Sequence, residues 1–179
     1  MKNRIFAIML AAMLSLSVAT TASAQGVKII DNCDCITSSS ITQAETKAQQ
    51  IENEYGYYMM YSIVDTIDTE TNYEYAQSVY EMNTTSDKGL ILLHNITDAG
   101  YVVYSTPEAE KIFTDSVVEE MGEVYNNTET YADGVMAYLN FAETVVANAP
   151  ANGEIQTNEE ATEFVPVERT YPLIVDNAD

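Results

Sequence analysis

The chain has 179 residues, of which 28 are acidic and only seven are basic, so its formal net charge at pH 7 is −21. This charge repels nucleic-acid phosphates and anionic lipid headgroups, which excludes nucleic acid as a partner and electrostatic docking on an acidic membrane. It favours solubility and the binding of cations or basic partners, with a solvated acidic surface as the plain alternative.

Residues 1–24 have the features of a secretory signal peptide. Lys2 and Arg4 give a positive start, an apolar stretch follows, and small residues precede Gln25. A retained membrane anchor is the alternative, although the apolar stretch is short for a membrane span. We therefore expect an exported chain, extracellular or in the cell envelope, that is cleaved near Ala24. Five basic and 28 acidic residues then remain, a net charge of −23.

The first predicted elements are a helix and a strand. Apolar residues at helical spacing predict a helix over 40–55, with Ser40 and Gln43 as a capping box and Gly56 as its end. The aromatic, β-rich run over 57–64 predicts a strand, and a polar loop follows it.

The middle of the chain predicts one more helix and two more strands. The helix covers 72–82, and the continuous apolar run over 90–94 is typical of a strand that is buried on both faces. After a tight turn, 101–105 completes a hairpin. The helical connection makes the first two strands parallel, and the hairpin adds an antiparallel third strand.

Three helices are expected in the last part of the domain. Thr106 and Pro107 predict the start of a short helix that ends near residue 113, because proline favours the first helical position. Two further helices are predicted over 115–125 and 130–147. The whole pattern predicts an α/β fold, an α/β/α sandwich with a small mixed β-sheet.

One domain is expected over residues 25–147, followed by an acidic linker over 148–170, where Asn, Glu, Thr and Pro replace the apolar residues. The segments "VKIIDNCD" (27–34) and "YPLIVDNAD" (171–179) share an apolar-apolar-Asp-Asn-x-Asp pattern. We therefore expect residues 171–179 to begin a second, truncated copy of the domain, in a tandem protein that is membrane-anchored beyond this chain.

Few residues of this chain match a familiar catalytic motif. The sequence has no G-x-S-x-G, no phosphate-binding glycine loop and no H-E-x-x-H. Its single histidine, His94, is expected to be a satisfied residue at a strand end. Cys33 and Cys35 are too few for a disulfide framework or a metal site, so we expect them to be incidental, without a structural or metal-binding role. A local disulfide across one residue is the alternative after export.

The remaining candidates are carboxylates in loops, which suit Ca²⁺. The loop before the second strand and the loop after the third lie at one end of the sheet, so Asp87 and Asp115 are expected to approach each other. Asp31 lies in the loop before the first helix, and Asp65 lies at the opposite end. The alternative is that these residues cap helices and turns, with Asp115 as a helix N-cap and Asp87 in a turn.

The order of "IIDNCD", "SDKGLILLHN", "YVVYST", "IFTD" and "YADGVMAYL" resembles the TPM domain family over residues 27–147. The resemblance implies an α/β/α sandwich, export or membrane association, Ca²⁺ binding by some members, and acid phosphatase activity attributed to a thylakoid member. By position, Asp31, Asp87, Gly89 and Asp115 fill the family's V-x-D, D-N-G and l-t-D places, which makes the three aspartates the expected metal ligands. Lys88 replaces the usual Asn, and it brings a positive charge beside that site.

We expect a domain that acts as an envelope-associated binding or quality-control module with a protein partner in the cell envelope and with Ca²⁺ as its cation. A divalent-metal-dependent acid phosphatase is the first alternative, in which loop carboxylates hold the metal. A structural spacer in a tandem surface protein is the second.

Overall fold

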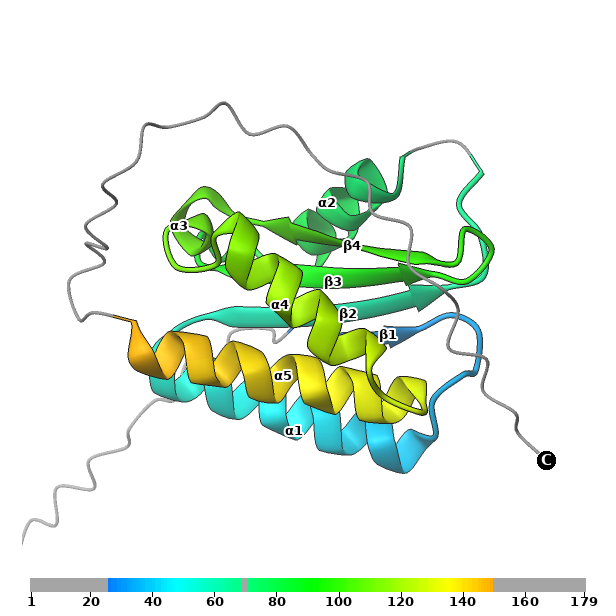
Figure 1. Ribbon diagram of the computed structural model, residues 1–179, viewed down its shortest axis with the longest axis horizontal. Coiled ribbons are helices and arrows are strands. Elements are labelled where there is room, and N and C mark those ends of the chain that lie inside the picture. Colours follow the sequence, from blue (N-terminus) through cyan, green and yellow to red (C-terminus); the bar gives the residue numbers. More distant parts are fainter. Residues whose placement is uncertain (1–25, 69–70, 150–179) are drawn as a thin grey trace, which may run out of the picture.

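The computed structural model describes residues 26–68 and 71–149, and Figure 1 shows their arrangement. Three regions named above lie outside the described residues: the signal peptide over 1–24, the linker beyond residue 149, and the repeated segment over 171–179. Their assignments stay predictions.

Four strands form one mixed sheet: β1 (Ile29–Asp31), β2 (Tyr58–Val64), β3 (Gly89–Asn95) and β4 (Gly100–Ser105). They lie side by side in chain order. The first three strands are parallel and β4 is antiparallel to β3, which confirms the predicted directions. The sequence-based expectation missed β1, which pairs with β2 through only three residues.

Helices cover both faces of this sheet, as Figure 1 shows. On one face lie α1 (Ser38–Tyr55), α4 (Asp115–Asn126) and α5 (Tyr131–Asn148), and on the other lies α2 (Asn72–Asn83). The short helix α3 (Pro107–Glu110) follows β4 at one end of the sheet. This arrangement confirms the α/β/α sandwich. None of the helices within 26–68 and 71–149 is long and apolar enough to cross a membrane.

Strand β3 joins the two cores because its side chains alternate between the faces. Leu90 and Leu92 pack with α1, α4 and α5, whereas Ile91 and Leu93 pack with α2. All four side chains are fully buried, so each contributes about 1.5–3 kcal/mol of hydrophobic free energy. This confirms the prediction of a strand that is buried on both faces.

The N-caps of two helices differ from the expected ones. Helix α1 begins at Ser38 with Thr37 as its N-cap, because the Thr37 hydroxyl accepts the N–H of Ser40 at 3.3 Å. The predicted capping box at Ser40 is therefore wrong. Helix α4 starts at Asp115, as predicted, and its N-cap is Thr114, so the alternative role of Asp115 as the cap is wrong. The predicted end of the first helix is confirmed, since Gly56 has the left-handed φ of 75°.

Candidate functional site

Asp87 and Asp115 lie at the same end of the sheet. Asp87 stands just before β3, and Asp115 follows β4 and α3. Because Ser105 at the end of β4 pairs with Leu90 at the start of β3, the two loops leave the sheet side by side. Both aspartates are exposed. The topology thus places both aspartates at one end of the sheet, and their role as metal ligands stays a prediction.

Thr106 ties the Asp87 loop to α3. Its hydroxyl donates to the carbonyl of Asp87 at 2.7 Å and accepts the N–H of Gly89 at 3.1 Å. The same oxygen caps α3 by accepting the N–H of Ala109 at 3.4 Å. Since Thr106 is buried, one hydroxyl satisfies three main-chain groups that water does not reach easily.

Replacing Thr106 with valine is expected to destabilise the domain by about 2 kcal/mol, because valine leaves the Gly89 N–H and the Asp87 carbonyl without their partner. Thr106→Ser is the matched control, since it keeps the hydroxyl and is expected to cost less. Urea unfolding of both variants measures the difference. Equal costs for valine and serine would show that the hydroxyl does not hold this loop.

Asp115 lines a small hollow at the end of the sheet that also carries Asp87, although Asp87 is not among its lining residues. The hollow has a volume of about 90 Å³ and lies between β4, α3 and α4. Its polar lining consists of Ser105, Glu110, Thr114 and Asp115, and its apolar lining of Val103, Phe113 and Val118. A pocket for a drug-sized ligand is several times larger. The hollow therefore suits an ion or a single side chain of a partner.

Two lysines stand at this end of the sheet. Lys111 binds Glu108 at 2.7 Å, and Lys88 lies 6.0 Å from the ring centroid of Tyr57. The hydrogen bond and charge of Lys111, with a smaller effect of Lys88, lower the pKa of Glu108. Glu108 therefore offsets part of the positive charge that Lys111 brings to this end of the sheet.

Asp31 lies at the other end of the sheet, which corrects the expectation that it joins Asp87 and Asp115. It ends β1 in register with Ile63, and Ile63 is in register with His94 near the end of β3. Asp87, by contrast, precedes the start of β3. At about 3.3 Å per residue, the strand length between the two ends is about 15 Å or more, which is too far for one ion to bridge. Asp31 instead shares the end that carries Asp65.

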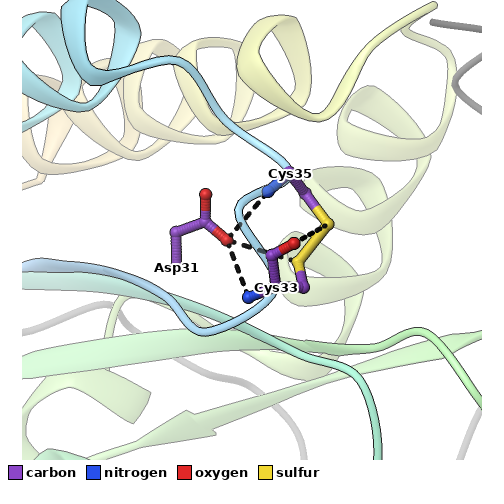
Figure 2. A group of neighbouring side chains, drawn as sticks. All are labelled: Asp31, Cys33 and Cys35. Carbon is purple, nitrogen blue, oxygen red and sulfur yellow. Dashed lines mark hydrogen bonds between the residues drawn. A yellow bond between two sulfur atoms is a disulfide. The ribbon is translucent and has the colours of Figure 1, made fainter.

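The Asp31 carboxylate holds the loop that carries the cysteines, as Figure 2 shows. Its Oδ1 accepts the N–H groups of Cys33 and Cys35, each at 3.1 Å, and its Oδ2 accepts the N–H of Ile36 at 2.8 Å. Cys33 and Cys35 form a disulfide, so the expectation that they are incidental is wrong. The alternative of a local disulfide across one residue is the one that the structure contains.

His94 lies near this second end and differs from the satisfied histidine that we expected. It is 3% exposed, and neither ring nitrogen has a hydrogen-bond partner among the described residues. Its ring centroid lies 5.1 Å from that of Tyr131 and 5.8 Å from that of Tyr125. Tyr125 in turn shares a hydrogen bond with Tyr61 at 2.8 Å between the hydroxyl oxygens. Burial lowers the pKa of His94 to about 4.

Sequence reasoning missed that Asp31, the disulfide and His94 share one end of the sheet. The cause is that strand β1 was not predicted. Without β1, nothing in the sequence placed Asp31 beside the ends of β2 and β3. The available signal was the short apolar pair Ile29-Ile30 before Asp31. Two such residues are too few to establish a strand without a known partner.

The comparisons with known proteins agree with this architecture. A family model described as the TPM domain matches residues 29–145. None of the curated proteins matches the sequence.

Three solved structures share the fold. The N-terminal domain of a protein from P. gingivalis is 10% identical with a TM-score of 0.58, and the match covers 69% of this chain and 84% of that one. The BA42 protein of Bizionia argentinensis is 13% identical with a TM-score of 0.54, covering 63% and 81%. The N-terminal domain of cg2496 from Corynebacterium glutamicum is 14% identical with a TM-score of 0.52, covering 77% and 90%. At these identities the likeness concerns the fold alone.

Proposed function

Because this chain belongs to the TPM domain family, we propose that it is an exported, acidic binding module of the cell envelope whose binding end carries Asp87 and Asp115. The observation that carries the proposal is the hollow between β4, α3 and α4, which two carboxylates and two hydroxyls line at the end of the sheet that also carries Asp87. We propose Ca²⁺ as the cation of this end and a protein of positive charge as its partner.

Oxygen chemistry supports the choice of Ca²⁺. The ion takes six to eight oxygen ligands from carboxylates, main-chain carbonyls and water in flexible geometry. Asp115 and Glu110 supply carboxylates in the hollow, and Ser105 and Thr114 supply hydroxyl oxygens. The proposed site keeps Asp87 and Asp115 from the sequence-based set and leaves out Asp31, which lies at the other end. Water fills the remaining positions, so we expect weak binding.

Adding Ca²⁺ is expected to raise the melting temperature of the purified chain. A site with a Kd of about 0.1–1 mM stabilises the native state by about 1.4–2.7 kcal/mol at about 10 mM Ca²⁺. Asp115→Asn is expected to reduce this shift most, because it removes a carboxylate of the hollow, and Asp87→Asn is expected to reduce it less, because Asp87 lies at the same end of the sheet but outside the lining. Differential scanning fluorimetry measures the shifts, and NaCl of equal ionic strength separates binding from the screening of the acidic surface.

Asp65→Asn is the matched control for these variants. Asp65 is also an exposed carboxylate in a loop beside the sheet, but it follows β2 at the opposite end. The Asp65→Asn variant is expected to leave the Ca²⁺-induced rise in melting temperature unchanged. A shift that falls equally in all three variants would mean that Ca²⁺ acts on the acidic surface in general, and the proposed site would then be wrong.

A metal-dependent acid phosphatase is the second candidate, and Lys88 and Lys111 favour it because both stand at the end that carries Asp87 and Asp115. Two ammonium groups beside a bound metal ion supply positive charge for a phosphoryl group. Turnover of a generic phosphomonoester that needs a divalent metal and is lost in Asp115→Asn would favour the enzyme over the binding module. A chain with neither Ca²⁺ binding nor turnover would fit the structural spacer.

A further inference from the structure

The loop of Asp31, Cys33 and Cys35 is a second cluster of metal-ligating atoms, separate from the proposed Ca²⁺ end. One carboxylate oxygen of Asp31 and the two sulfurs all lie within 4.8 Å of one another. Within the part of the chain that the structure describes, this is the one group of three such side chains at that spacing. All three are partly buried, so the cluster is accessible from solvent.

The main chain fixes the Asp31 carboxylate in place. An ionised carboxylate accepts about four hydrogen bonds, and three of these positions are taken by the N–H groups of Cys33, Cys35 and Ile36. One position is therefore left for a further partner. Cys33 Sγ already lies 3.2 Å from Oδ1. Carboxylates that bind metals are usually held by such outer hydrogen bonds, which orient them before the ion arrives.

The backbone turns both cysteines toward the same side. Asp34, which separates them, has a φ of 56°, in the left-handed region that Asp tolerates better than most residues. This turn brings the Cα atoms of Cys33 and Cys35 to 5.3 Å from each other. The short spacing thus serves two states of the loop, a disulfide when the sulfurs are oxidised and a pair of adjacent thiols when they are reduced.

The surroundings argue against a redox enzyme. Catalytic cysteines stand in electropositive surroundings that favour the thiolate. Here the Asp31 carboxylate lies 3.2 Å from Cys33 Sγ and disfavours a thiolate, and the whole chain carries a net charge of −21. A cation reverses this balance, because a bound metal ion favours deprotonated sulfur and is itself attracted by the carboxylate.

We propose that reduction of the Cys33–Cys35 disulfide converts this loop into a binding site for a thiophilic divalent cation such as Zn²⁺. A dithiol donates two electrons and two protons, the S–S bond breaks, two S–H groups form, and the dithiol becomes a disulfide. The metal ion then replaces the two thiol protons, which pass to the buffer. Two thiolates and Asp31 give three protein ligands, and water takes the fourth tetrahedral position. The oxidised loop offers no thiolate and does not bind Zn²⁺ in this way.

Titration of the purified chain with Zn²⁺ tests the proposal, with and without a water-soluble phosphine that reduces the disulfide and becomes a phosphine oxide. Calorimetry is expected to show binding to the reduced chain at least about tenfold tighter than to the oxidised chain, a difference of ~1.4 kcal/mol. Co²⁺ in place of Zn²⁺ is expected to give a thiolate-to-metal charge-transfer band with the reduced chain alone.

Three variants separate this site from general binding to an acidic surface. The double variant Cys33→Ser/Cys35→Ser is expected to lose the tighter binding and the charge-transfer band. Asp31→Asn is expected to weaken Zn²⁺ binding by about tenfold or more, whereas Asp34→Asn, which changes an exposed neighbour, leaves it nearly unchanged. Near-ultraviolet circular dichroism checks that the reduced chain and each variant stay folded.

Several results would overturn the proposal. Equal Zn²⁺ affinity in the reduced and oxidised chains would show that the thiols are not ligands. Full affinity in Asp31→Asn would exclude the carboxylate from the site. Loss of the folded signal on reduction would also contradict the proposal, since the site requires the loop in its folded shape.

Discussion

Replacing His94 with phenylalanine is expected to remove an acid-sensitive part of the stability of this domain. The imidazole is buried among tyrosine rings and has no hydrogen-bond partner among the described residues, so the native state favours its neutral form. Phenylalanine has a similar shape and no charge to bury. The variant is therefore expected to be about as stable as the wild type near pH 7.5 and more stable near pH 4.

The direction follows from the two pKa values of His94. Burial lowers the pKa from 6.5 to about 4 in the folded chain, so between these values the unfolded chain binds more protons. Stability that is present above pH 6.5 is thus lost as the pH falls towards 4. Below pH 4, His94 is protonated in both the folded and the unfolded chain, so the loss stops. A depression of this size corresponds to about 3 kcal/mol.

Urea unfolding of the wild type and of His94→Phe between pH 7.5 and 4 measures this loss. The difference between the two free energies of unfolding isolates His94, because the acidic residues titrate in both proteins. The sequence contains one histidine, so its NMR titration is unambiguous. A measured pKa near 6.5, or parallel stability curves for the two proteins, would contradict the prediction.

Replacing Glu52 with glutamine is expected to destabilise the domain by about 3 kcal/mol or more, because it leaves a buried ammonium group without its counter-ion. Lys28 is 1% exposed, and its Nζ lies 2.9 Å from Glu52 and 4.1 Å from the ring centroid of Tyr58. Burial, and then the charge of Glu52, raise the pKa of Tyr58 to about 12. The ion pair at 2.9 Å makes Glu52 the carboxylate that balances Lys28.

Lys28→Met is the informative partner of that variant. Methionine keeps the apolar stem and removes the charge, so Lys28→Met is expected to cost much less than Glu52→Gln. The double variant Lys28→Met/Glu52→Gln is therefore expected to be only slightly less stable than Lys28→Met alone. Thermal and urea unfolding measure these costs. A cost of Glu52→Gln that is equally large in the presence and absence of Lys28 would show that the ion pair is not the cause.

Local patterns were sufficient for most of the elements that the structure contains. The continuous apolar run before His94 predicted a strand with two buried faces, and β3 packs against helices on both sides. Thr106 and Pro107 predicted the start of α3, and Gly56 predicted the end of α1. These signals lie within one element and concern backbone geometry or periodic burial, so they need no distant partner.

The ends of two elements show where local signals fail. Helix α3 ends at Glu110, three residues before the predicted end, and Thr37 caps α1 in place of Ser40. Several Ser and Thr residues near residue 40 could each cap a helix. The choice among them depends on where the loop from β1 delivers the chain, and this is a tertiary constraint.

The sequence by itself determined the mixed sheet, the helices on its two faces, the TPM family resemblance and the acidic character of the surface. Only the tertiary structure decided that β1 exists, because its three residues gain their hydrogen bonds from β2, about 30 residues further along the chain. That pairing in turn placed Asp31 away from Asp87 and Asp115. It also brought Lys28 beside Glu52 in the core. Contacts between distant segments leave no periodic trace in the sequence, and such contacts decide which charges are buried and which ligands share a site.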